Sequence, residues 1–238
     1  TIGFWSAIRL FINIFTPRLS PATTLSFRHM DKFSKLTIEN QNIESKEDGM
    51  QIGFTIGEMA DRVEGLLKSI GLVKNFAPII YAVGHGASSV NNTHYAGYDC
   101  GACSGRPGSV NARVISYMAN HPEVRNILRD RGIDIAAKTT FLGALHDTTR
   151  DGIEFYDDNF ADLAKTDLHK HNKLVFKQAL ERNARERARR FETTAYHADL
   201  NKLHESVKKR SISLFEPRPE LNHATNALCI IGRRELTK

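Results

Sequence analysis

The sequence predicts an α/β fold, and three observations support that class. Apolar residues recur at helical spacing over residues 59–70, which indicates an amphipathic helix. Two short apolar runs, Phe76–Val83 and Thr139–Leu145, have the length and composition of buried strands. The first run leads into His85 and the second into His146. In open α/β sheets, sites form where strands end at their carboxyl edge, so both histidines are candidates for chemistry.

Composition is that of a globular protein in a reducing compartment. The 238 residues are 41% hydrophobic and 25% charged, which is enough chain to bury a core. The net charge of +6 comes mostly from a helical stretch, Lys170–Arg190. Its aromatic residues are not interleaved in the way that a base-stacking surface needs, so we expect a solvated surface and no nucleic-acid partner. Three cysteines, Cys100, Cys103 and Cys229, are too few for a disulfide framework, and Cys229 in its apolar run is expected in the core.

The chain divides into three predicted segments. Residues 1–50 form an N-terminal helical and linker segment, residues 51–165 an α/β half-domain with the candidate site, and residues 166–238 a long amphipathic helix with an irregular C-terminal segment. The apolar stretch Thr1–Phe15 is too short to span a bilayer and lacks the features of a signal peptide. We expect it to be a helix packed within a larger protein, of which this chain is an internal or C-terminal portion.

The other elements follow from local signals. Thr55 and Glu58 have capping-box spacing before a helix that ends near Gly71, whereas the polar stretch Asn40–Gly49 predicts a loop. The remaining expected elements are a long Gly-rich loop at Ser88–Ser109, helices at Asn111–Ala119, Pro122–Arg131 and His171–Phe191, and strands at Ile153–Tyr156 and Ala227–Ile231. Five histidines in polar or helical contexts are expected on the surface: His121, His169, His171, His197 and His204.

The stretch after the first strand carries the metal-binding chemistry. His85, Cys100 and Cys103 are residue types that zinc prefers, and a histidine at a strand end followed by a loop that supplies a cysteine is a reasonable half of a zinc site. The CxxC spacing of the cysteines is also that of a redox pair. A cysteine nucleophile paired with His85 or His146 is a further alternative. His146 could be a ligand, although the Asp-Thr-Thr after it also suits a turn or helix cap.

Several motifs together resemble one known family. The stretch GHGASSVNNTHYAGYDCGACSGRPGSVNARV at Gly84–Val114 is similar to the site loop of the DabA family, zinc-containing subunits of a bacterial inorganic carbon transporter. Phe141–Thr149 resembles the family's ALHDTT segment, and Glu186–Phe191 (ERARRF) resembles its ER.RRF helix. Arg218–Ala227, followed by Gly232-Arg-Arg, resembles its RPELGHATNA block. The resemblance implies a β-carbonic-anhydrase-like core: a mostly parallel sheet flanked by helices, a long Gly-rich site loop and helical additions.

The resemblance also implies a ligand set. The family's zinc is held by two Cys, one Asp and one His, so His85 and Cys100 match two of the ligands. The other Cys and the Asp belong to a C-x-D-x-R motif, which these 238 residues lack. They are expected on a strand in the remainder of the same polypeptide. The residues expected around the ligands are Cys103, Asp99, Asn111, Arg113 and His146, with Arg113 a possible anion clamp.

The implied function is carbonic-anhydrase-like hydration of CO2 to bicarbonate at Zn2+ within an energy-coupled uptake complex. The partner is a membrane antiporter-like subunit of the DabB type, and the chain is expected to be peripheral on the cytoplasmic side of the inner membrane. Two alternatives are a structural zinc module without catalysis and a thiol or redox enzyme that uses Cys100 and Cys103.

Overall fold

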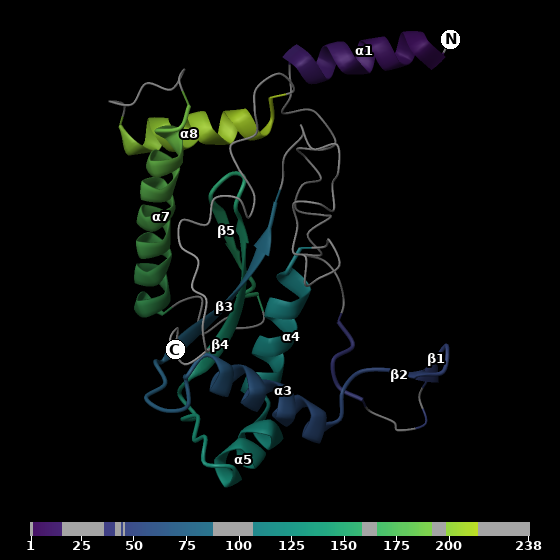
Figure 1. Ribbon diagram of the computed structural model, residues 1–238, viewed down its shortest axis with the longest axis vertical. Coiled ribbons are helices and arrows are strands. Elements are labelled where there is room, and N and C mark those ends of the chain that lie inside the picture. Colours follow the sequence, from purple (N-terminus) through teal and green to yellow (C-terminus); the bar gives the residue numbers. More distant parts are fainter. Residues whose placement is uncertain are drawn as a thin grey trace, which may run out of the picture.

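The computed structural model describes residues 2–15, 36–40, 44, 46–87, 107–158, 166–191 and 199–213. Its helices and strands confirm the α/β class (Figure 1). In chain order they are α1 (Ile2–Phe15), β1 (Lys46–Glu47), β2 (Met50–Gln51), α3 (Ile56–Ser69), β3 (Ile79–Gly86), α4 (Ser109–Asn120), α5 (Pro122–Asp130), β4 (Thr140–Asp147), β5 (Gly152–Phe155), α7 (Asp167–Ala188) and α8 (Leu200–Ser211).

The central feature is a three-stranded sheet of order β3-β4-β5. β3 pairs with β4 in parallel, and β4 pairs with β5 antiparallel, so the sheet of the described residues is mixed. The mostly parallel, carbonic-anhydrase-like sheet implied by the resemblance stays a prediction, as does the division into three segments. The last expected strand, Ala227–Ile231, lies outside the described residues, together with Cys229 and His197.

The helix α3 confirms its predicted start. The Thr55 side chain accepts a hydrogen bond from the backbone N–H of Glu58, and the Glu58 carboxylate accepts one from the backbone N–H of Thr55 at 2.8 Å. This is a capping box, which satisfies two N–H groups that the first turn of a helix leaves unpaired. The hydrogen bond from Thr55, with a smaller contribution from Gln51, lowers the pKa of Glu58 below its ordinary value.

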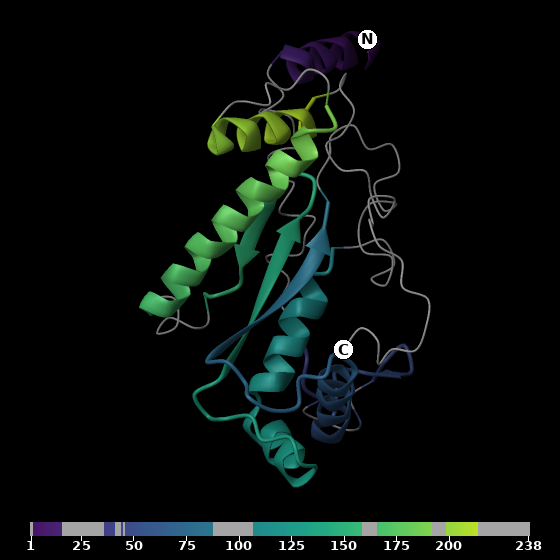
Figure 2. The same ribbon diagram turned by 60° about the vertical axis from the view of Figure 1, so that its left-hand side comes forward.

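One face of the sheet packs on α4. Alternate residues of a strand point to opposite faces, and Ile80 and Phe141 face the same side as Gly84 and Gly143. At Gly143 a Cβ atom would lie 3.1 Å from the Ala112 carbonyl oxygen of α4, so the missing side chain permits close contact. The hydrophobic core on this side joins α3, α4, α5 and β4 through Met59, Val63, Leu67, Met118, Val124, Leu128 and Phe141. Figure 2 shows α4 against the strands.

The opposite face packs on α7, which crosses the strands on the side away from α4 (Figure 2). The rings of Tyr81, Phe155 and Phe176 meet with centroids 5.2 to 5.5 Å apart. His169 lies among them with 0% of its surface exposed, so its predicted surface position is wrong. Its Nδ1 lies 2.8 Å from the Tyr81 hydroxyl and its Nε2 lies 3.2 Å from an Asp157 carboxylate oxygen. These two hydrogen bonds explain how a polar ring is buried here.

Three elements differ from the sequence-based expectations. The first two are the strands of a short hairpin: β1 and the turn lie within the predicted loop Asn40–Gly49, and β2 follows it. The turn residues Asp48 and Gly49 have positive φ angles of 50° and 78°. Asp and Gly adopt such angles at low cost, which is why this pair suits a tight turn. Helix α8 was not expected at all. It crosses the end of α7 and packs on it through Leu203 and Val207.

Helix α1 lies apart from the other described elements (Figures 1 and 2). Its large apolar side chains are exposed, with Trp5 at 70% and Phe4, Phe11 and Phe15 above 60%. In the described part of the chain, no helix combines the length and the apolarity needed to cross a membrane.

Candidate functional site

The two candidate histidines lie side by side at the carboxyl end of the sheet. Both strands run further than the sequence predicted, so His85 is within β3 and His146 within β4. The register pairs His85 with His146 directly. Neighbouring strands are about 4.8 Å apart, and in-register residues of a parallel pair point to the same face. The fold therefore brings together two imidazoles that are 61 positions apart (146 − 85) on the face that carries α7.

The glycine before His85 lets β3 touch the start of α4. A Cβ atom at Gly84 would lie 2.4 Å from the backbone oxygen of Gly108, a distance that no side chain allows. The Gly108 N–H donates a 2.7 Å hydrogen bond to the His85 carbonyl oxygen. Close approach of two backbones thus explains glycine at both positions. The consequence is a fixed backbone at His85.

The turn after β4 is fastened to the end of β3. Thr148 donates to the Gly86 carbonyl oxygen through its backbone N–H at 2.9 Å and through its hydroxyl at 3.2 Å. The Asp147 carboxylate accepts a 3.1 Å hydrogen bond from the Thr149 N–H, which confirms a turn at this position. Asp147 and Thr149 are both buried. The ends of the two histidine-bearing strands therefore form one connected unit.

A buried carboxylate, Asp151, holds His146. Asp151 has 0% of its surface exposed and lies in the left-handed region at φ 50°, which Asp tolerates better than most residues. Its Oδ1 lies 3.3 Å from His146 Nε2 and accepts a 2.8 Å hydrogen bond from Asn183. Its Oδ2 accepts a 2.8 Å hydrogen bond from Arg187. An unpaired charge would be costly at this depth, so these partners make the arrangement stable.

Arg187 also binds the backbone of the turn. Its guanidinium donates to the Thr148 carbonyl oxygen, and at 2.8 Å to that of Thr149. From α8, His204 Nε2 lies 2.9 Å from the Arg150 carbonyl oxygen. His204 is therefore buried, and its predicted surface position is wrong. Helices α7 and α8 together fix the segment that carries Asp151.

The other predicted site residues are not all gathered here. Asn111 is exposed on the first turn of α4. The Arg113 guanidinium lies 5.6 Å from the centre of the Tyr156 ring, on the face of the sheet opposite the histidine pair. Asp99, Cys100 and Cys103 fall outside the described residues. Within the described part of the chain, no three His, Cys, Asp or Glu side chains lie together in a way that could hold a metal ion.

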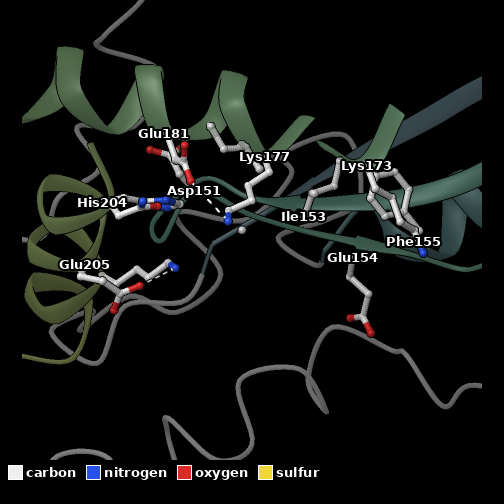
Figure 3. A pocket seen from close by; sticks show the side chains of 13 residues that line it. Asp151, Ile153, Glu154, Phe155, Lys173, Lys177, Glu181, His204 and Glu205 are labelled. Atoms are coloured by element: carbon white, nitrogen blue, oxygen red, sulfur yellow. Dashed lines mark hydrogen bonds and ion pairs between the residues drawn. The ribbon is translucent and has the colours of Figure 1, made fainter. Parts of the chain in front are cut away.

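A groove of about 760 Å³ opens beside Asp151, between β5, α7 and α8 (Figure 3). Its lining charges are of both signs, and several are paired with each other. Lys208 is 2.9 Å from Glu205, and Lys177 is 3.7 Å from Glu181. Such a balanced lining favours neither an anion nor a cation, so the candidate chemistry remains with the histidine pair.

Sequence reasoning missed three residues of this cluster: Asp151, Asn183 and Arg187. Asn183 and Arg187 are four residues apart on α7, so they share one helix face, and this spacing was a usable signal. Arg187 also lies inside the ERARRF stretch that carries part of the family resemblance. Asp151 gave no local signal, because only tertiary contacts bring it to His146.

Comparison with known proteins gives one consistent result. The family model described as "Probable inorganic carbon transporter subunit DabA" matches residues 1–238. A protein of that name from Azotobacter vinelandii is 61% identical over the whole chain, which spans 28% of that relative. One from Nitrosospira multiformis is 55% identical over the whole chain, which spans 26% of that relative. A "DabA 2" from Sorangium cellulosum is 40% identical over the whole chain, which spans 24% of that relative.

The chain thus spans about a quarter of the length of these curated relatives. No solved structure matches it. Since the family model covers every residue of the chain, the chain belongs to the DabA family.

Proposed function

We propose that this segment supplies His85 and Cys100 to a zinc centre in a subunit of an inorganic carbon uptake complex. The observation that supports this most is the in-register pair of His85 and His146 at the carboxyl ends of two parallel strands. Open α/β sheets place their ligands at this edge. The names of the relatives, probable inorganic carbon transporter subunits, indicate the process in which such a centre would act.

The residues present fit zinc. Imidazole nitrogen and thiolate sulfur are the donors that Zn2+ prefers in proteins. The loop that carries Cys100 leaves the sheet at Ala87 and returns at Pro107, and Gly108 is hydrogen-bonded to His85 itself. Both ends of that loop are thus anchored beside His85. Cys100 precedes Pro107 by seven positions (107 − 100), so an extended chain of this length easily reaches the histidine.

We place the remaining proposed ligands at the edge of the sheet. In the sheet of the described residues β3 is an edge strand, and parallel strands are normally buried between neighbours. A strand from the rest of the polypeptide, carrying the family's Cys-x-Asp pair, would pair with β3 there. Its carboxyl end would then lie next to His85 and complete a four-ligand site.

The proposed reaction is hydration of CO2 to bicarbonate. A bound zinc ion lowers the pKa of a coordinated water to about 7 and so supplies hydroxide at neutral pH. The role of this chain would be to hold the ligand His85 rigidly, through the close contact of Gly84 with Gly108 and the hydrogen bond from Gly108. The partner we propose is a membrane antiporter-like subunit of the DabB type that couples ion flow to uptake. The subunit itself would be peripheral on the cytoplasmic side of the inner membrane.

Metal analysis of the full-length protein tests the proposal. We expect one zinc per subunit, lost in His85→Ala and in Cys100→Ala, because each removes a ligand. Cys103→Ala serves as the matched control, since Cys103 is expected beside the site and not in it. The proposal fails if Cys103→Ala empties the site while Cys100→Ala does not.

Two other results would also overturn the proposal. A reversible Cys100–Cys103 disulfide in a metal-free protein would favour a thiol or redox enzyme. A zinc site with four closed ligands that never admits water or CO2 would favour a structural zinc module.

A further inference from the structure

We propose that Arg187, acting through Asp151, is a positioning residue that holds His146 beside His85 as an additional polar group of the zinc site. This inference rests on the proposed function, because it gives His146 and Arg187 roles at that same site. Neither residue belongs to the ligand set of two Cys, one Asp and one His.

The first step is that Asp151 is built into the fold to serve more than one partner. Its two oxygens meet three side chains: Arg187 on Oδ2, and Asn183 and His146 on Oδ1. An ion pair with Arg187 alone would already neutralise the buried charge. The second oxygen instead faces the histidine of β4. The carboxylate thus connects α7 to the end of the sheet.

The second step concerns the orientation of the His146 ring. When an imidazole carries a single proton, a carboxylate at one ring nitrogen favours the tautomer with the N–H at that nitrogen. With Nε2 donating to Asp151, Nδ1 is the acceptor atom of His146. Histidines at metal sites are commonly oriented by such carboxylates, and loss of the carboxylate weakens metal binding.

The third step is the direction of exposure along the cluster. The side chain of Asp151 is 0% exposed, that of Arg187 16%, and that of His146 28%. His146, in register with His85, is therefore more accessible than Asp151 and Arg187, which hold it, although Asn183 of the same cluster is exposed on α7.

The fourth step is that Arg187 fixes the backbone as well as the side chain. Its guanidinium binds the carbonyl oxygens of Thr148 and Thr149, and Thr148 in turn binds Gly86, the neighbour of His85. A change at Arg187 is therefore transmitted to both histidine-bearing strands. Its five N–H groups in a planar array make these simultaneous contacts possible, and a lysine could not reproduce them all.

The test measures the zinc dissociation constant of the full-length protein by competition with a chromophoric chelator, together with the unfolding temperature of the metal-free protein. We expect His146→Gln, Asp151→Asn and Arg187→Met each to raise the dissociation constant about 10- to 100-fold, the usual effect of losing an orienting contact at a metal site. Arg187→Lys should restore part of the affinity. Zinc content at saturation should persist, because His85 is intact.

Arg189→Met is the matched control. Arg189 lies two positions after Arg187, at the C-terminal cap of α7, is half exposed, and pairs with Glu186 at 3.0 Å on the surface. The same change of residue type there should leave the zinc dissociation constant within about twofold, the scatter that we allow for a surface substitution.

The outcomes separate this inference from the proposed function. If His146→Gln leaves zinc affinity unchanged while His85→Ala abolishes binding, the zinc site stands and the role of His146 is refuted. If Arg187→Met lowers only the unfolding temperature of the metal-free protein, Arg187 is structural and the inference fails. If the wild-type protein binds no zinc, or binds it equally well without His85, the proposed function itself fails. Should Asp151→Asn not fold, the partly exposed His146→Gln still decides the matter.

Discussion

Replacing Gly84 by alanine tests whether the backbone at His85 is fixed by its contact with α4. The new Cβ atom would lie 2.4 Å from the Gly108 carbonyl oxygen and 2.6 Å from the Gly108 carbonyl carbon. Both are backbone atoms at the start of a helix, and they cannot move aside as the end of a flexible side chain can. The strand and the helix must therefore separate.

The cost can be worked from these contacts. Forcing extra volume into a packed interior typically costs about 1–3 kcal/mol, and a clash with rigid backbone belongs at the upper end. Separation also loosens the 2.7 Å hydrogen bond from Gly108 to the His85 carbonyl oxygen, worth about 1 kcal/mol. We expect a total loss of about 3–4 kcal/mol in the local stability of this end of the sheet.

Native-state hydrogen exchange of the full-length protein, resolved by peptide, measures that loss. At a factor of ten per 1.4 kcal/mol, amides of β3 and the first turn of α4 should exchange about 100- to 1,000-fold faster in Gly84→Ala. Zinc affinity should fall as well if His85 is a ligand. The control is Gly65→Ala in α3, where a Cβ atom meets nothing within 4 Å. Alanine is the better helix former by about 1 kcal/mol, so exchange in α3 should slow. Unchanged exchange in Gly84→Ala would refute the close packing described here.

Two further predictions concern α7 and α1. Burial by itself would raise the pKa of Asp157, but hydrogen bonds from Lys173 and His169 outweigh it and lower that pKa. The ionised Asp157 therefore stabilises the folded state above about pH 4, and this contribution is lost as the pH falls through the lowered pKa of the folded state. Asp157→Asn should reduce hydrogen-exchange protection of α7 at pH 7 by more than at pH 3.5, and an equal reduction at both would contradict this. Helix α1 is apolar nearly all round, with Arg9 its one charged residue, so we expect it to pack against the rest of the longer polypeptide. In the full-length protein, the cysteine of Trp5→Cys should therefore resist labelling by an aqueous maleimide, both in membranes and after extraction into detergent. Labelling that appears only after extraction would instead place α1 on lipid.

Local signals in the sequence predicted most of the elements. The capping box at Thr55, the helical spacing behind it and the two apolar runs report on contacts within a few residues, and each proved to be a helix or strand close to its expected bounds. The positions of His85 and His146 at strand ends also followed from these runs. Their direct register did not, because pairing between strands depends on the packing of the whole sheet.

The sequence could not reveal which polar residues are buried. His169 is followed by charged and polar residues and looks like any exposed helix position, yet Tyr81, 88 residues away, covers it. Likewise Arg187 in the basic helix resembles its exposed neighbours Arg185 and Arg189, and only its partners 36 to 39 residues earlier set it apart. Periodicity describes one element at a time, and these burials are made between elements.

Three of the separated motifs that carry the family resemblance meet in three dimensions, within the described part of the chain. Gly84–Gly86, Gly108, the Asp-Thr-Thr turn after His146 and Arg187 of the ERARRF stretch contact one another directly at one end of the sheet. Motifs needed only for the core would have mapped to the cluster formed by α3, α4 and α5, which lies towards the other end of β4 at Phe141. Their convergence around two histidines is instead what the proposed site would require. It also shows why the polar face of α7 matters: the helix contributes the charge that orders this end of the sheet, while α4 on the opposite face contributes close backbone packing.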